Sequence, residues 1–156
     1  MKIAIASDLS GFELKAAIKD FLIEKGYEVL DFGIEDKNHP KPYFEQAPKV
    51  AKAIQNKEAD KGILICGTGQ GMAIVANKHK GIYACVVDSV FSGERAKIIN
   101  RANVITLGGW VSAPFVATEI VDGWLNREFC EKMEFKRDFL TNAYNKVVEI
   151  EKENFK

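Results

Sequence analysis

The sequence LICGTGQGMAIVANK, residues 64–78, is the stretch that decides the fold class. The overlapping segment 61–67 is almost wholly apolar, which is typical of a strand inside a parallel sheet that helices cover on both faces. Cys66 lies near the end of this strand, glycines follow at positions 67, 69 and 71, and a helical pattern begins at about residue 70. A glycine-rich turn between a buried strand and a helix indicates an α/β protein with a ligand site at that turn.

Short strands and longer helices alternate along the rest of the chain. Strands are expected at 2–7, 27–33, 61–67, 82–88 and 102–109, and helices at 11–26, 45–57, 70–79, 89–100, 113–126 and 132–153. This pattern predicts a three-layer α/β/α sandwich around a five-stranded parallel Rossmann-like sheet, with an extra C-terminal helix. No linker, internal repeat or low-complexity tract divides residues 1–156, so we expect a single domain.

The composition argues against several classes of protein. Lys plus Arg equals Asp plus Glu at 22 each, which does not favour a nucleic-acid surface. No run approaches the roughly 20 apolar residues that a membrane span needs. Three widely spaced cysteines and two histidines provide neither a disulfide framework nor a metal-ligand cluster. We therefore expect a cytoplasmic protein that uses no metal or cofactor and binds neither nucleic acid nor membrane.

The expected fold also predicts where a ligand binds. In doubly wound sheets, ligands gather at the carboxyl ends of the strands. The residues that follow the expected strands are Asp8, Cys66 to Gly71, Asp88, and Gly108 to Trp110. The fold therefore predicts that these residues share one cleft.

Three common uses of a glycine-rich loop do not fit residues 66–77. A dinucleotide fingerprint needs a third glycine where Met72 stands, and it normally opens the fold instead of following the third strand. A phosphate-binding P-loop needs a Lys-Ser/Thr pair after the last glycine, and none is present. A cysteine phosphatase needs an arginine in the loop, and residues 66–77 contain neither arginine nor lysine.

The remaining interpretation is a reactive thiol at the end of a buried strand. Free N–H groups at the start of the following helix favour negative charge on the Cys66 thiolate and on a bound anion. The glycines would let the backbone approach a ligand closely, and Thr68 adds a hydroxyl donor. Such an arrangement suits a reaction in which negative charge develops on oxygen while a proton moves. The alternative, that Cys66 is only a buried core cysteine, stays open at this point.

Five segments together resemble a known family. SDLSGFELK (7–15), YEVLDFG (27–33), GILICGTGQGMAIVANK (62–78), GIYACVV (81–87) and NVITLGG (103–109) are similar to the ribose-5-phosphate isomerase B and galactose-6-phosphate isomerase family. The resemblance implies metal-independent interconversion of a small aldose and ketose, or their phosphates, through a cis-enediolate. It also implies a homodimer or homotetramer in which the C-terminal helix packs on a partner subunit and active sites are shared.

The same resemblance implies roles for individual residues. Cys66 would be the base that moves a proton between C1 and C2 of the sugar, with Thr68 and Asp8 as the other catalytic residues. Thr68 and the amides of Gly69 to Gly71 would hold the enediolate oxygen, Asp8 would bind sugar hydroxyls, and Arg137 would bind phosphate. The substrate-binding residues would be Leu9, Gly67, Gly69, Gln70, Gly71, Asn100, Trp110 and Arg137.

The chain departs from the family at four positions. Leu9 and Ile99 stand where ribose-5-phosphate isomerases have histidines, the second of which opens the sugar ring. Trp110 and Met133 stand where arginines are expected. These changes favour an isomerase whose substrate is open-chain or differently charged, with specificity altered from ribose 5-phosphate. The alternative is a non-catalytic sugar-phosphate-binding homologue, or one subunit of a hetero-oligomeric isomerase.

Overall fold

The parallel sheet forms the middle layer of the molecule. A computed structural model describes residues 1–155. Its elements, in chain order, are β1 (Lys2–Ser7), η1 (Leu9–Gly11), α1 (Phe12–Glu24), β2 (Glu28–Asp31), α2 (Tyr43–Gln55), β3 (Lys61–Cys66), α3 (Gln70–Ala76), β4 (Ala84–Val86), α4 (Val90–Ile98), β5 (Val104–Gly108), α5 (Pro114–Leu125), η2 (Glu134–Lys136) and α6 (Arg137–Asn154). The five strands lie in the order β2-β1-β3-β5-β4, and every pair is parallel.

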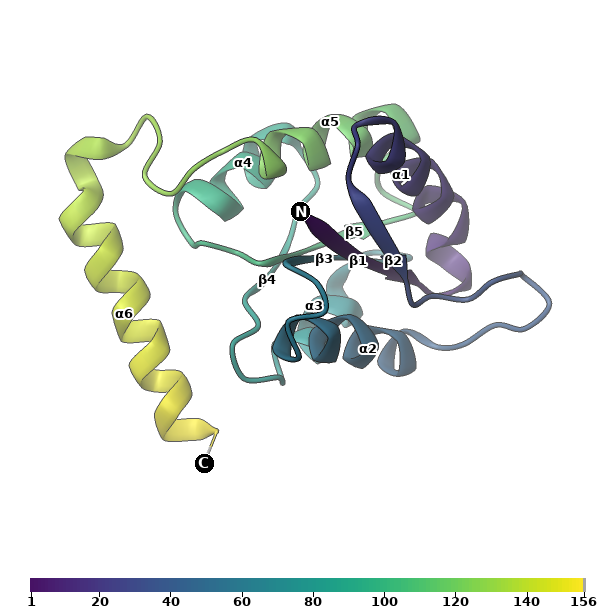
Figure 1. Ribbon diagram of the computed structural model, residues 1–156, viewed down its shortest axis with the longest axis horizontal. Helices are drawn as coiled ribbons and strands as arrows, with labels where there is room; N and C mark the ends of the chain where they lie inside the picture. The colour runs from purple at the N-terminus through teal and green to yellow at the C-terminus, as the bar shows by residue number, and fades with distance from the viewer. Residues whose placement is uncertain (156) are drawn as a thin grey trace.

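Helices cover both faces of the sheet, as the alternating pattern predicts. Side chains on a strand point alternately to opposite faces, so Ile3 and Ile5 of β1 pack on one side while Ala4 and Ala6 pack on the other. The first side carries α1, α4 and α5, and the second carries α2 and α3 (Figure 1). The predicted α/β/α sandwich is therefore confirmed.

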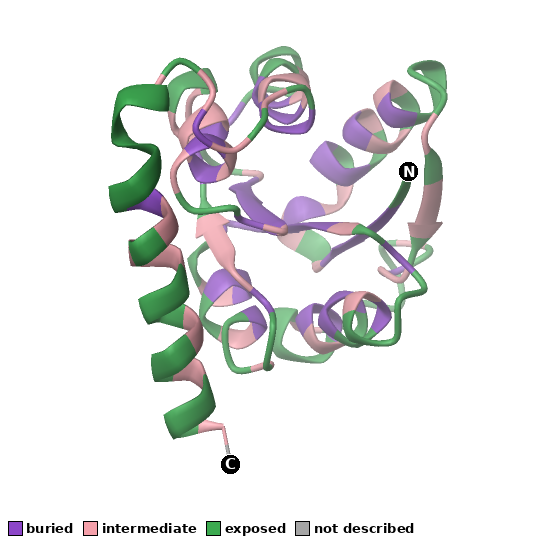
Figure 2. Cartoon of the chain, turned by 60° about the vertical axis from the view of Figure 1, so that its left-hand side comes forward, coloured by how far each residue is buried: buried purple, intermediate pink, exposed green. Residues whose placement is uncertain are grey.

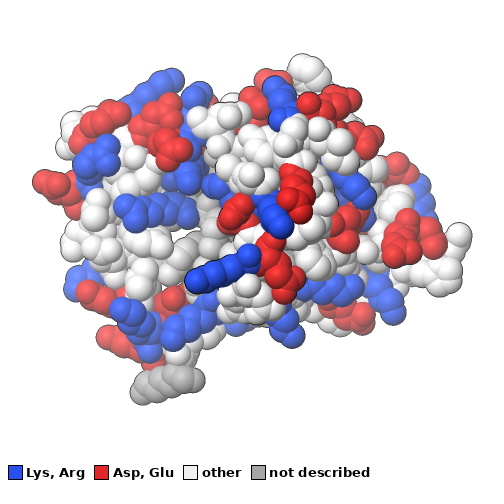
Figure 3. Space-filling view, in the orientation of Figure 1, with Lys and Arg blue, Asp and Glu red and all other residues white. Residues whose placement is uncertain are grey.

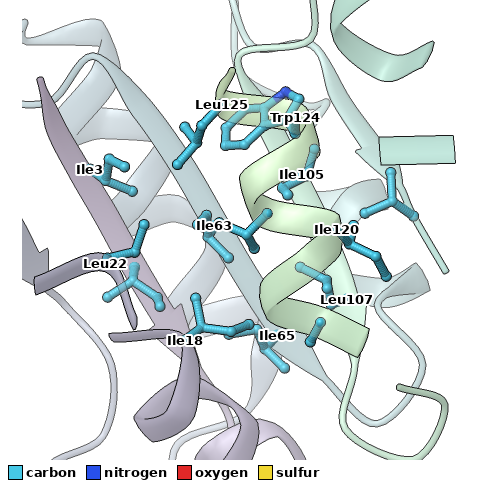
Figure 4. Close-up of a cluster of buried hydrophobic side chains, with 14 of the residues drawn as sticks. Ile3, Ile18, Leu22, Ile63, Ile65, Ile105, Leu107, Ile120, Trp124 and Leu125 are labelled. Carbon is cyan, nitrogen blue, oxygen red and sulfur yellow. The ribbon is translucent and has the colours of Figure 1, made fainter. Parts of the chain in front are cut away.

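The larger hydrophobic cluster lies between the sheet and α1 and α5. Ile63 of β3 pairs in register with Ile105 of β5, and both side chains are fully buried. Trp124 of α5 is also fully buried, and its indole Nε1–H donates to the Ala102 carbonyl at 3.2 Å. Figure 4 shows these side chains gathered between α5 and the strands. Burying a large apolar side chain contributes about 1.5–3 kcal/mol, so this cluster is a main source of stability between the sheet and these helices.

The C-terminal helix α6 lies apart from the three layers (Figures 1 and 2). It begins at Arg137, later than the expected residue 132, because 134–136 form the short 3₁₀ turn η2. Leu140 is its only buried residue within the described part of the chain. Tyr144 contacts the guanidinium of Arg101, and Glu151 accepts hydrogen bonds from the Gly81 N–H at 2.6 Å and the Tyr83 hydroxyl at 3.3 Å. A few polar and aromatic contacts therefore hold α6 against the β4 edge.

Positive and negative side chains are mixed over the face shown in Figure 3, in keeping with the formal net charge of zero. Residues 1–155 contain no helix that is both long and apolar enough to span a bilayer. The same residues contain no group of three or more His, Cys, Asp or Glu side chains placed to hold a metal ion.

Candidate active site

Cys66 is the last residue of β3, and backbone hydrogen bonds fix its position. It lies opposite Gly108 of β5, and its carbonyl accepts the N–H of Gly109 at 2.7 Å. The residue is 5% exposed, and its Sγ accepts the N–H of Gly69 at 3.1 Å. An N–H directed at sulfur stabilises negative charge on it. The sulfur is thus held in place by a backbone donor of the loop.

The glycines of the loop also allow close packing within the protein. Gly69 has φ +80°, a left-handed conformation that favours glycine, and a Cβ there would lie 3.0 Å from the backbone of Leu107. A Cβ at Gly67 would lie 2.7 Å from the indole of Trp110, and one at Gly71 would lie 2.8 Å from the ring of Tyr43. Side chains or backbone of the protein therefore fill the space beside each glycine. Gly67 and Gly71 are nevertheless walls of the cavity that contains Cys66, so the expectation that the loop backbone can approach a ligand stays a prediction.

Asp8 follows β1 and lies at the same edge of the sheet. Its Oδ1 accepts the N–H of Gly11 at 3.1 Å, which caps the turn η1. Burial raises the pKa of the Asp8 carboxyl, and the N–H groups of Gly11 and Ser10 offset that rise only in part. Asp8 is consequently a partly desolvated carboxyl group that can accept or donate a hydrogen bond.

These residues line one cavity of about 360 Å³. Its walls are Asp8, Ser10, Tyr43, Cys66, Gly67, Thr68, Gln70, Gly71, Ile74 and Trp110. The structure thus brings together seven of the residues predicted for the site, namely Asp8, Cys66, Gly67, Thr68, Gln70, Gly71 and Trp110. Gly69 contacts the same site through its bond to Sγ.

Three wall residues were missed by the sequence analysis. Tyr43 and Ile74 lie at the start of α2 and within α3, and Ser10 lies in η1. Ser10 and Ile74 stand only a few positions from Asp8 and Gly71, so adjacency in the sequence is a signal for them. Tyr43 is 23 positions from Cys66 and has no such signal.

Three other predicted site residues, Leu9, Asn100 and Arg137, lie outside this cavity. Asn100 lines a second cavity of about 320 Å³, together with Ile99 and α6 residues such as Leu140 and Tyr144. Arg137 begins α6, which Figure 1 shows on the opposite side of the molecule from the end of β1. Leu9 is in η1 and exposed, but it is not a wall of the Cys66 cavity.

The expectation that Asp88 shares the cleft is wrong for a physical reason. β4 occupies the edge of the sheet, and β5 separates it from β3. Asp88 instead precedes Ser89, the N-cap residue of α4, and its Oδ1 accepts the hydroxyl of Ser92 at 3.2 Å.

The fold and the cavity together define a doubly wound α/β protein with polar groups gathered at the carboxyl ends of its strands. A sulfur held beside an N–H, a hydroxyl and a partly buried carboxyl lie together in this cavity, and groups of these kinds can exchange protons with a ligand. No Lys or Arg of residues 1–155 lines the cavity.

Comparison with known proteins identifies the family. Residues 3–139 match the family model described as Ribose/Galactose Isomerase. The 4-deoxy-4-sulfo-D-erythrose isomerase of Clostridium sp. (strain MSTE9) is 47% identical over 97% of this chain and 96% of its own length. The D-erythrulose-4-phosphate isomerase of Pectobacterium atrosepticum is 41% identical over 83% of this chain and 85% of its own. The structure of Clostridium thermocellum ribose-5-phosphate isomerase B superposes with a TM-score of 0.90 at 40% identity, over 99% of both chains. The chain belongs to the ribose/galactose isomerase family and is an aldose–ketose isomerase.

Proposed function

We propose that this chain interconverts a four-carbon aldose and ketose that carry a terminal anionic group, with Cys66 as the base. The single observation that carries the proposal is the position of Cys66. Its thiol ends β3 within the cavity, and its Sγ accepts the Gly69 N–H at 3.1 Å. In the proposed reaction no metal takes part.

The proposed reaction is a balanced proton transfer. The Cys66 thiolate removes the proton on C2 of the aldose, and the electron pair of that bond forms the C1–C2 double bond of a cis-enediolate. The charge that develops on oxygen is stabilised by the Thr68 hydroxyl and loop amides, while Asp8 binds a sugar hydroxyl. The thiol then returns the proton to C1 while the hydroxyl proton on O2 moves to O1, which gives the ketose.

Two relatives support a four-carbon substrate. They are named for 4-deoxy-4-sulfo-D-erythrose and D-erythrulose 4-phosphate. An aldose of this length closes a five-membered ring only through a free hydroxyl on C4, and a sulfonate or phosphate ester at C4 removes that hydroxyl. Such a substrate is open-chain and needs no ring-opening residue. Ile99, which stands where the resembled family has a ring-opening histidine, fits this chemistry.

We also propose a homo-oligomer with shared sites. The Cys66 cavity has no cationic wall within residues 1–155, whereas an anionic substrate requires a positive partner. Arg137 and Asn100 lie on the side of the chain near α6, where a two-fold axis would bring them to a neighbouring cavity. The apolar side chains of Phe139, Val147 and Ile150 on α6 are exposed and available for a partner subunit.

A cytoplasmic location is part of the proposal. Cys66, Cys85 and Cys130 are all free thiols. Free thiols are the usual state in a reducing compartment.

The test is a panel of open-chain and cyclic sugars, phosphorylated, sulfonated and free, incubated with the protein in deuterated water. We expect deuterium at the carbon next to the carbonyl, and formation of the paired sugar, with the four-carbon anionic members of the panel. Incorporation into none of them would overturn the isomerase assignment and leave a sugar-binding homologue. Incorporation with cyclic ribose 5-phosphate at a rate equal to the four-carbon sugars would overturn the proposed substrate class.

A further inference from the structure

Trp110 has an unusual combination of a fixed backbone and an uncovered side chain. Its N–H donates to the Gly67 carbonyl at 3.0 Å, so it is tied to the residue that follows the thiol. The six-membered part of its indole lies against Gly67, where a Cβ would come within 2.7 Å of Cε3 and Cζ3. Nevertheless the residue is 75% exposed. A large aromatic ring with this much free surface, on the wall of a cavity, is placed to contact whatever occupies that cavity.

A second aromatic ring stands at the other end of the glycine loop. Tyr43 packs on Gly71 in the way that Trp110 packs on Gly67, and both rings are walls of the cavity that contains Cys66. The loop between the two glycines carries Thr68, whose Oγ1 already accepts the N–H of Gln70 at 3.3 Å. With the reacting end of a substrate at Cys66, the rest of its carbon chain would lie in a cavity whose walls include both rings.

We propose that the indole of Trp110 is the specificity-determining wall that limits the substrate to a short carbon chain. This inference rests on the proposed function and adds to it the residue that selects substrate length. A longer sugar, with its carbonyl end held at Cys66, would have to push the indole away from Gly67. That displacement loses the contact between ring and backbone, and the N–H tie to Gly67 prevents the backbone from following.

The expected size of this selection is modest and measurable. One additional carbon unit in a fitted pocket typically changes kcat/KM by about 10–200-fold. Erythrulose 4-phosphate and ribulose 5-phosphate are the best pair for the measurement, because neither ketose has the free hydroxyl required to close a furanose ring. Both are therefore open-chain and carry the same phosphate, and they differ in chain length alone. Any preference between them cannot arise from ring opening.

The experiment measures kcat/KM for these two ketoses with the wild type and with Trp110→Ala, Trp110→Phe and Val111→Ala. The wild type should favour the four-carbon ketose by at least tenfold. Trp110→Ala should reduce that ratio at least tenfold by gaining activity on the five-carbon ketose. Trp110→Phe, which keeps a ring over Gly67, should retain most of the preference. Val111 is 58% exposed but is not a wall of the cavity, so Val111→Ala serves as the matched control and should leave the ratio unchanged.

Two results would overturn the role of Trp110. One is a wild type that uses both ketoses equally well. The other is a Trp110→Ala protein, folded by circular dichroism, that loses activity on both ketoses by the same factor. A wild type that incorporates no deuterium into either ketose would instead overturn the proposed function itself, and with it the selection of length.

Discussion

The Cys66 cavity and the region between β4 and α6 differ in how they are built. In the first, a thiol, a hydroxyl and a carboxyl lie within one cavity, and the N–H groups of Gly69 and Gly109 hold Cys66 from two directions. The second also contains a cavity, but its walls are largely apolar and α6 contributes many of them. Asn100 lies there with the thiol of Cys85 and two tyrosine hydroxyls, but no carboxyl of residues 1–155 lines that cavity. The groups proposed to react therefore all lie in one chain. Asn100 and Arg137, which are proposed to contact the anionic substrate, lie on a face that a partner subunit would complete.

The largest effect should come from removing the thiol. Replacing a positioned acid–base group typically costs about 10²–10⁴-fold in rate, so Cys66→Ser should lower kcat by this amount while the thermal unfolding midpoint changes little. Cys85 and Cys130 lie outside the cavity and provide matched controls. Cys85→Ser and Cys130→Ser should affect stability alone. A Cys66→Ser enzyme with more than a tenth of wild-type kcat would contradict the role of the thiol as base.

The second prediction tests whether the two regions meet across subunits. Cys66→Ser and Arg137→Ala should each be inactive alone, and mixing them under conditions that exchange subunits should restore activity. Equal mixing of a dimer gives half mixed dimers with one intact site each, which corresponds to about one quarter of wild-type activity. The measurement is initial rate against mixing time, with exchange followed by native mass spectrometry. Confirmed exchange without restored activity, or a fully active monomer, would contradict a shared site.

A third prediction concerns the ion pair between α1 and β2. Lys15 is almost fully buried, and its Nζ donates to Asp31 at 3.0 Å and to the Ile34 carbonyl at 2.8 Å. Lys15→Met should lower the free energy of unfolding by about 2 kcal/mol, less than the loss of a fully buried pair, because Asp31 keeps some contact with water. Lys19 is the matched control because it also contacts Asp31 but is more exposed, so Lys19→Met should cost less than about 1 kcal/mol. The measurement is the free energy of unfolding in urea. Equal losses for Lys15→Met and Lys19→Met would contradict the prediction.

The Lys15–Asp31 ion pair also makes the stability of the protein depend on pH. Burial alone would raise the pKa of Asp31, but hydrogen bonds from Lys15, the Gly33 N–H and Lys19 outweigh it and leave the pKa lowered. A carboxyl with a lowered folded-state pKa stabilises the protein above its unfolded pKa of about 3.9, and this contribution is lost as the pH falls through the folded value. Wild-type stability should therefore decline below about pH 4. Lys15→Met should show a weaker decline over the same range.

The smallest effect is expected at the anchor of α6. Tyr83→Phe removes the hydroxyl that donates to Glu151 at 3.3 Å, which should cost about 0.5–1.5 kcal/mol. Because this contact lies at the second region, hydrogen exchange should increase in α6 and remain unchanged in β3. An equal increase in both elements would show that the two regions do not move independently.

The fold and the thiol loop could be predicted from the sequence because their signals are local. Apolar strand runs and helical periodicity determine the elements, and Cys66 with its glycines is one continuous stretch. Asp88 follows β4, so its position depends on the strand order. In this sheet β4 pairs with β5 and forms the edge, away from β3. The packing of Tyr43 on Gly71 depends on how the loop after β2 returns to the sheet. Such contacts join distant segments, and no local pattern specifies them.

The two tryptophans give the protein two separate optical signals. Trp124 is fully buried with its indole N–H bonded to a carbonyl, whereas Trp110 is 75% exposed beside the thiol. The first indole emits from an apolar interior at shorter wavelength, and the second emits from a water-contacting position at longer wavelength. A ligand that covers Trp110 would shift only the long-wavelength part of the emission. Occupancy of the cavity can therefore be followed by intrinsic fluorescence, without a label and before any chemical step.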